Sequence, residues 1–88
     1  MATNTFYLRI ASAKKIFFSG RCVSIILPVA DGQEEILAHH ENMVNAVENG
    51  ELKFKPEGAD KYTTVVVGTG FAQIINNRVT VLVETAEL

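Results

Sequence analysis

Residues 61–83 read Lys-Tyr-Thr-Thr-Val-Val-Val-Gly-Thr-Gly-Phe-Ala-Gln-Ile-Ile-Asn-Asn-Arg-Val-Thr-Val-Leu-Val. This stretch contains three short runs of β-branched and aromatic residues, separated by Gly-Thr-Gly and by Asn-Asn. Val, Ile, Thr, Tyr and Phe favour strands, whereas Gly and Asn favour the turns between strands. The stretch therefore predicts three successive strands, over 61–67, 71–75 and 79–83.

Similar runs occupy the rest of the chain. Residues 5–11 alternate, so that Phe6, Leu8 and Ile10 share one face. Residues 22–29 are apolar on both faces. Further strands are predicted at 16–18, 34–38 and 51–55, with turns at Ser19-Gly20, Asp31-Gly32 and Pro56-Glu57-Gly58.

The segment 39–48 is ambiguous, because its apolar residues fit both the spacing of a helix and the alternation of a strand. Asn49-Gly50 follows at once, and Asn-Gly between apolar runs is a strong hairpin signal, which favours the strand. About ten short strands at this spacing predict an all-β domain, an antiparallel β-sandwich or barrel. With no linker or repeat, residues 1–88 are expected to form this one domain.

Composition limits the classes of function. The chain has 88 residues, of which 48% are hydrophobic and 20% charged, as in a packed globular domain. Its net charge is −2 and its eight Lys and Arg residues form no basic run, so nucleic acid is not an expected partner. No apolar stretch approaches the roughly 20 residues that span a bilayer, and no secretory signal opens the chain. The single cysteine, Cys22, is expected to be a buried apolar residue.

The chemistry-bearing residues do not form a recognisable catalytic motif. Gly68-Thr69-Gly70 resembles the start of a dinucleotide fingerprint, but Gln73 occupies the third glycine position and a strand follows. These glycines are better explained by tight turns or close approach of strands. Cys22 has no identifiable base and orienting group. We therefore expect neither an enzyme nor a bound cofactor.

His39 and His40, with Glu34, Glu35 and Glu41 nearby, suggest an alternative function as a free-standing β domain that binds a metal or a small ligand. Adjacent residues of a strand point to opposite faces, so the two imidazoles do not share a site without a tight loop. No metal site is therefore the expectation.

Surplus apolar surface favours a binding function. A two-layer sandwich needs only one face of each strand for its core, yet 22–27, 65–67 and 79–83 are apolar on both faces. A large exposed apolar patch on a small domain usually marks a partner.

Short motifs in a fixed order resemble a known family over essentially the whole chain. The chain is similar to the N-terminal β-sandwich domain of the epsilon subunit of F-type ATP synthases. The motifs that carry this resemblance are Ser12-Ala13, Phe18-Ser19-Gly20, Pro28, Gly32, His40, Gly50-Glu51-Leu52, Gly70-Phe71, Val79-Thr-Val-Leu82 and Thr85-Ala86.

The resemblance implies a non-catalytic rotor subunit of the central stalk, which helps to couple proton transport to ATP synthesis. Its implied partners are the gamma subunit and the polar loops of the c-ring. It would sit peripherally on the cytoplasmic face of a bacterial inner membrane, or on the equivalent face in an organelle. By position, the implied c-ring contact comprises Asp31, Gly32, Gln33 and Glu34, and the implied gamma contact comprises Ser12, His40 and Met43.

Two features depart from the family pattern. The segment 32–42 has neither the Gly-Glu-Leu/Ile-Gly turn nor the Pro-Gly-His-Ala-Pro run that relatives usually carry, so its loop geometry is not transferable. After 79–83, Thr85 has the character of a helix N-cap with only three residues behind it. Relatives continue there into a helical hairpin that inhibits ATP hydrolysis. The expectation is that this hairpin and its inhibition are absent from the chain.

Overall fold

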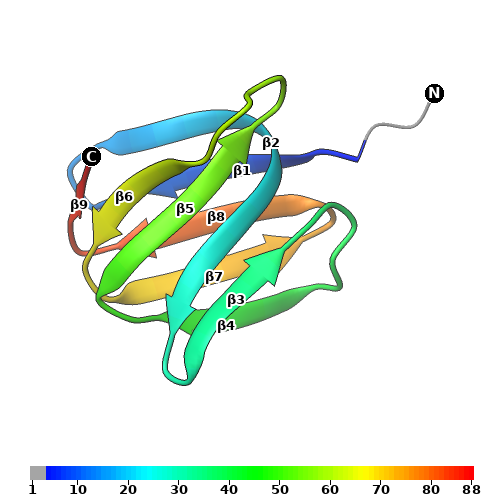
Figure 1. Cartoon of the computed structure of the whole chain (residues 1–88). Helices are drawn as coiled ribbons and strands as arrows, with labels where there is room; N and C mark the ends of the chain where they lie inside the picture. Colours follow the sequence, from blue (N-terminus) through cyan, green and yellow to red (C-terminus); the bar gives the residue numbers. More distant parts are fainter. Residues whose placement is uncertain (1–3) are drawn as a thin grey trace.

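The computed structural model describes residues 4–88, which form nine strands and contain no helix (Figure 1). The strands are β1 (Phe6–Ala11), β2 (Ile16–Val29), β3 (Gly32–Ile36), β4 (Met43–Val47), β5 (Gly50–Pro56), β6 (Thr63–Val67), β7 (Gly70–Ile75), β8 (Arg78–Val83) and β9 (Ala86–Glu87).

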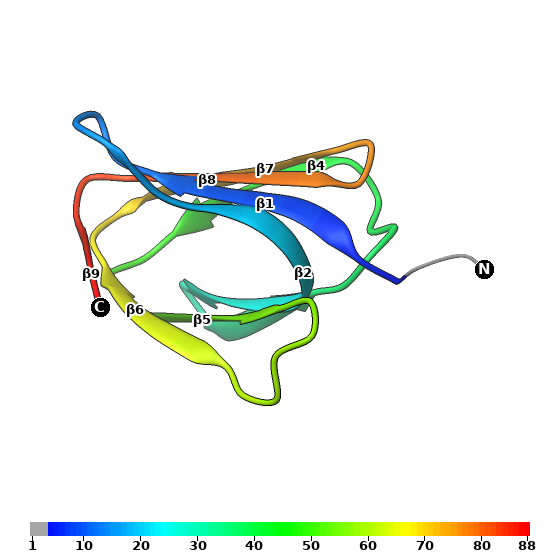
Figure 2. The same cartoon turned by 90° about the horizontal axis from the view of Figure 1, so that it is seen from above.

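A single hydrogen-bonded sheet folds over on itself to make two layers. The strand order is β4-β7-β8-β1-β2-β5-β6-β9, and β3 pairs with β2 off this path. The 14-residue β2 belongs to both layers, because its first half pairs with β1 and its second half with β5 and β3. A register shift between Cys22 and Ser24 marks the bend, as expected of a β-bulge. Figure 2 shows β2 curving from the β1–β8 layer into the β5–β6 layer.

The core fills the space between these layers with side chains from alternate positions of nearly every strand. Phe18 and Phe54 meet across it with ring centroids 4.5 Å apart. The fully buried side chains include Phe6, Leu8, Ile10, Cys22, Ile25, Leu27, Ile36, Leu52, Ala72, Ile74, Val79 and Val81. The all-β sandwich and the predicted inward face of residues 5–11 are confirmed. One strand pair departs from the antiparallel expectation, because β1 and β8 run parallel.

Two predicted turns are wrong. Ser19-Gly20 lies inside β2, where Ser19 pairs with Arg9 and Gly20 with Leu8. Asn49-Gly50 does not close a hairpin, since β4 pairs with β7 whereas β5 pairs with β2 and β6. Instead it carries the chain from one layer to the other, and the Glu48 N–H donates to the Pro28 carbonyl at 2.9 Å. Local turn chemistry was outweighed here by the pairing of distant strands.

Other turn residues behave as predicted. Asn76 and Asn77 both have positive φ, 50° and 66°, and make the two-residue turn between β7 and β8. Gly70 is required by close approach, because a Cβ at that position would lie 1.9 Å from the Leu82 carbonyl oxygen. This contact holds the start of β7 tightly against the end of β8.

Thr85 does not act as a helix N-cap, although its residue type suits that position. Ala86 and Glu87 pair with Val67 and Val66 as the short strand β9. The Gly68 N–H donates to the Thr85 carbonyl at 2.9 Å, which fixes the approach to this pairing. Pairing with β6 gives the backbone groups of β9 hydrogen-bond partners. This pairing outweighs the preference of threonine for a helix N-cap.

Candidate docking surfaces

The tip of the β2–β3 hairpin carries the predicted c-ring contact. Ala30 and Asp31 make the turn, and Gly32 adopts a φ of 130°, a conformation that favours glycine. Asp31 and Gln33 are exposed, whereas Glu34 is half-buried. The hairpin therefore presents one free carboxylate rather than two.

Glu34 is held from behind by the neighbouring layer. Its Oε1 accepts a hydrogen bond of 2.6 Å from the Asn45 side-chain amide of β4. This bond joins the edge strand of one layer to the edge strand of the other and braces the hairpin. The role of Asn45 could not be predicted from local sequence, because Asn45 and Glu34 are brought together only by the fold.

The loop between β3 and β4 is pinned to the β7–β8 turn. His39 has a φ of 66°, and its N–H donates to Asn77 Oδ1 at 2.7 Å. In return, the Asn76 N–H donates to Asn42 Oδ1 at 2.8 Å. Asn42 lies in the stretch whose geometry the family pattern left undetermined, and these bonds define it.

The three residues of the predicted gamma contact do not form one cluster. Ser12 lies in the β1–β2 hairpin, next to the ends of β1 and β8. Met43 pairs with Ile74 at the opposite end of the same layer, is half-buried and packs against the core. His40 lies at this second end, half-buried, with Nδ1 2.8 Å from the Glu41 carbonyl.

Between those two ends, the layer exposes large apolar side chains on its outer side. Val44, Phe71 and Leu82 are 63%, 46% and 39% exposed. Phe71 pairs with Leu82 on one side and with Ala46, two residues from Val44, on the other. We call Val44, Phe71 and Leu82 the outer apolar surface. The runs that are apolar on both faces indicated such a surface, and Leu82 belongs to one of them.

A hollow of about 380 Å³ extends the outer apolar surface toward the β1–β2 hairpin. Its lining residues are Ser12, Ala13, Thr69, Gly70, Phe71, Leu82, Val83 and Glu84. Ser12 is therefore the one member of the predicted gamma contact that lines a depression shared with Phe71 and Leu82.

The alternative metal site lacks a set of ligands. Within residues 4–88, no group of three His, Cys, Asp or Glu side chains is placed to hold an ion. His39 is exposed, and His40 is turned toward a backbone carbonyl. The geometry thus gives the metal-binding alternative no support.

Cys22 is fully buried in the core. Burial raises the pKa of its thiol to about 11, because the charged thiolate would lose its hydration. A thiol in that state is a poor nucleophile, and Cys22 serves as a core residue. Among residues 4–88, no helix has the length and apolar character required to cross a membrane.

Comparison with known proteins decides the family. Residues 5–88 match the family described as "ATP synthase, Delta/Epsilon chain, beta-sandwich domain". The chain belongs to this family. The description assigns residues 5–88 to a β-sandwich domain that occurs in the delta and epsilon chains of ATP synthases.

Relatives in several lineages are named as ATP synthase epsilon chains. The chain is 37% identical over 83 residues to the epsilon chain of Ruminiclostridium cellulolyticum, covering 94% of this chain and 60% of the relative. It is 34% identical over 83 residues to the chloroplastic epsilon chain of Pinus koraiensis, covering 94% and 59%. The chain thus spans about 60% of the length of the curated relatives it matches.

Solved structures share the fold. A chain of the Euglena gracilis mitochondrial ATP synthase superposes with a TM-score of 0.87 at 22% identity, covering 98% of this chain and 54% of the other. A chain of the Tetrahymena thermophila mitochondrial ATP synthase, from its central stalk and c-ring, gives 0.76 at 14% identity, covering 91% and 63%. At these identities the likeness establishes the β-sandwich architecture.

Proposed function

We propose that residues 4–88 act as a docking module of the ATP synthase central stalk, which binds the gamma subunit and the c-ring and helps to couple proton transport to ATP synthesis. Membership of the family supports the assignment to the ATP synthase complex, and the outer apolar surface supports a role in binding a partner subunit. Exposed Val44, Phe71 and Leu82 on one sheet face are the observation that carries the proposal, because such a patch on a small domain is stabilised by a partner.

Gamma is the proposed occupant of the outer apolar surface. Ser12 borders this surface through the shared hollow. His40 precedes the exposed strand β4, and Met43 supports that strand from the core side. The interface is expected to bury on the order of 1,200 Å² or more, the size of a stable specific complex.

The β2–β3 hairpin is the proposed c-ring contact, through Asp31, Gly32, Gln33 and Glu34. Asp31 and Gln33 offer an exposed carboxylate and amide, and Glu34 stiffens the strand behind them through Asn45. An acidic tip suits basic side chains on the c-ring loops, and such rim contacts set register more than affinity. We infer a peripheral position on the cytoplasmic face of the membrane, or on the equivalent organellar face, as the location that such a contact would require.

Residues 4–88 include no helix, so this segment is proposed to dock and transmit torque without inhibiting ATP hydrolysis by helix insertion. Mixing the 88-residue chain with purified gamma subunit tests the proposal. Co-elution at micromolar concentration is expected. Separate elution at that concentration would remove the gamma contact from the proposal.

A further inference from the structure

All three arginines of the chain lie on the outer side of the layer that carries the outer apolar surface. Arg78 on β8 pairs with Tyr7 on β1, and Tyr7 pairs with Arg21 on β2. Arg9 lies two residues beyond Tyr7 and therefore points to the same side. All three arginines are exposed. We call Arg9, Arg21 and Arg78 the arginine row.

No acidic residue occupies an outward strand position of this layer within residues 4–88. The outward positions of β4, β7, β8, β1 and the first half of β2 follow from the alternation and the pairing registers. They hold only apolar, neutral polar and arginine side chains. The chain as a whole has a net charge of −2, so the clustering of positive charge here runs against its overall sign.

Two of the guanidinium groups are held in place. Arg21 donates from Nη2 to Thr5 Oγ1 at 3.0 Å and to the Thr5 carbonyl at 3.4 Å, and from Nε to Oγ1 at 3.3 Å. Arg78 lies over the Tyr7 ring, with Cζ 5.3 Å from the centroid. Because ordered side chains lose less entropy on binding, such groups are prepared for a partner.

Tyr7 lies at the centre of the row, between Arg78 and Arg21 on the neighbouring strands. Its hydroxyl is hydrogen-bonded to Ser19 Oγ. The pKa of Tyr7 is lowered from its ordinary value, first by this hydrogen bond and then by Arg9 and Arg78. The positive charge of the two arginines thus favours an anion at this position.

The spacing selects the kind of anion. Neighbouring strands lie about 4.8 Å apart, so the backbones at Arg78 and Arg21 are separated by roughly 10 Å across β1. Arg21 is tied to Thr5 on one side of Tyr7, and Arg78 is stacked on the ring. The two guanidinium groups are thus held by different neighbours, at separate positions of the row. They match a segment with several carboxylates, to which arginine binds in a planar, bidentate manner.

We infer that the arginine row is a docking site for an acidic protein segment that carries at least two carboxylates. The row continues the sheet face of the outer apolar surface, so one partner can engage both, but its chemistry does not depend on that partner being gamma. Complementary charge beside an apolar contact speeds association and fixes orientation.

The test is a titration of the isotopically labelled chain with a short fluorescent oligoglutamate peptide at low ionic strength. Backbone resonances of Tyr7, Arg9, Arg21 and Arg78 are expected to shift. Arg9→Gln combined with Arg78→Gln, which leaves the Arg21–Thr5 bonds in place, should weaken peptide binding roughly tenfold because two charge-assisted contacts are lost. Lys53→Gln combined with Lys55→Gln is the matched control, because both lysines lie on the opposite layer.

Three outcomes would overturn the inference. The first is peptide shifts of equal size around Lys53 and Lys55. The second is unchanged peptide affinity in the double arginine variant while its thermal unfolding stays that of the wild type. The third is stronger binding of inorganic phosphate, or of anionic phosphatidylglycerol vesicles, than of the peptide at the same resonances. Gamma is present in none of these measurements. A negative result would therefore overturn the inference about the arginine row without affecting the proposed gamma contact, which co-elution tests separately.

Discussion

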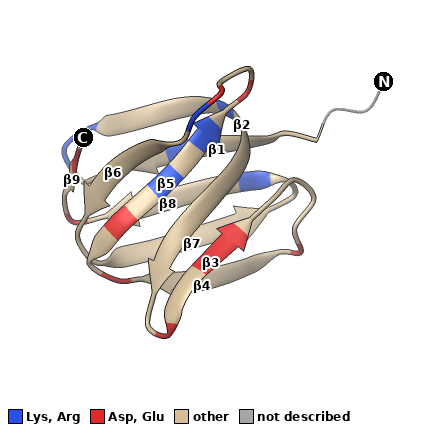
Figure 3. Ribbon diagram, viewed as in Figure 1, with Lys and Arg blue, Asp and Glu red and all other residues tan. Residues whose placement is uncertain are grey.

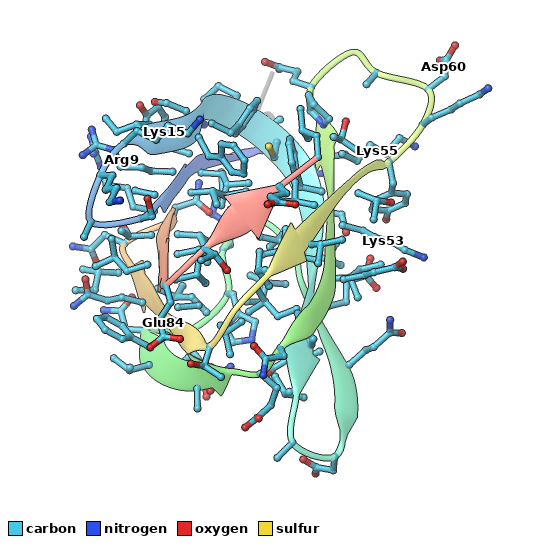
Figure 4. All side chains as sticks on the ribbon, turned by 90° about the vertical axis from the view of Figure 1, so that its left-hand side faces the viewer. Arg9, Lys15, Lys53, Lys55, Asp60 and Glu84 are labelled. Carbon is cyan, nitrogen blue, oxygen red and sulfur yellow. The ribbon has the colours of Figure 1, made fainter. Side chains whose placement is uncertain are left out.

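The two outer faces of the sandwich are built from the same kind of strand but carry different chemistry. The β4–β7–β8–β1 face combines the outer apolar surface with the arginine row. The opposite face alternates charges, for example Glu51 and Lys53 two residues apart on β5. Figure 3 shows acidic and basic positions together along β5, and in Figure 4 Arg9 projects from the other side of the molecule than Lys53 and Lys55.

This difference indicates which face is adapted to water and which to a partner. Mixed charges keep a sheet face hydrated and discourage edge or face association. On the β5 face even an exposed ring is covered by a charge, with the Lys55 ammonium 5.9 Å from the centre of Tyr62. Phe71 on β7 and Leu82 on β8 are not covered in this way, because neither strand contains a lysine or an acidic residue.

The largest effect is expected from a charge placed in the outer apolar surface. Leu82→Glu or Phe71→Glu should weaken gamma binding by roughly 30-fold or more, since central apolar contacts of an interface contribute about 2 kcal/mol or more. Val66→Glu is the matched control, because Val66 is 54% exposed on the opposite layer. Isothermal titration with gamma measures the affinities. Equal losses in the Leu82 and Val66 variants would remove the contrast between the faces.

The next effect concerns the border of the hollow. Gly70→Ala places a Cβ 1.9 Å from the Leu82 carbonyl oxygen, which separates β7 from β8. Overpacking of this kind destabilises a domain by about 1–3 kcal/mol. At Gly20 the same change meets only the Phe18 ring, at 3.2 Å, and should cost less. Urea unfolding compares the two variants, and equal midpoints would show that β7 and β8 are not closely joined at Gly70.

A smaller effect is expected at the hairpin brace. Asn45→Ala removes the bond to Glu34 and should lower the free energy of unfolding by about 1 kcal/mol, the usual net contribution of a hydrogen bond. Asp31→Asn, at the exposed tip, should leave stability unchanged and weaken only c-ring association. Chemical unfolding and binding to purified c-ring separate the two roles. Loss of stability in the Asp31 variant would mean that the tip is structural.

At neutral pH the smallest effect is that of the Cys22 thiol, because its influence on stability changes only near and above pH 9. Folding raises the pKa of the Cys22 thiol from 9.0 to about 11, so its contribution to stability is fully present below pH 9. Between pH 9 and about 11 the unfolded chain loses this proton while the folded chain keeps it, and stability falls. Cys22→Ala should reduce this loss, measured as the difference between the two proteins in urea midpoint across that range. Parallel curves would contradict the raised pKa.

Much of the fold was predictable because alternation reports burial directly. The inward set of β1 and the Asn76-Asn77 turn follow from local rules. The crossing at Asn49-Gly50 does not, since the residue pair is compatible with a hairpin and only the pairing of β4 with β7 excludes one. The strand β9 likewise depends on an edge supplied by β6, remote from Thr85 in sequence.

The docking surfaces were predictable in kind but not in composition. Runs apolar on both faces indicated an exposed apolar surface, yet they also pointed to Val66, which lies on the other layer. The arginine row could not be predicted from the sequence, because Arg78 lies beside Tyr7 only through the parallel pairing of β1 with β8. Parallel pairing of strands distant in sequence leaves no mark on local periodicity.

The contrast between the two faces is tested most directly by measuring whether bound gamma protects a cysteine on each face from chemical labelling. Leu82→Cys and Val66→Cys each place an exposed thiol on one face, while native Cys22 is buried and gives no background. Maleimide labelling of each variant is measured with and without saturating gamma subunit. Gamma should slow labelling at position 82 by roughly tenfold or more, because the core of an interface excludes water, and should leave labelling at position 66 unchanged. Protection at position 66, or equal labelling at both positions, would contradict this prediction.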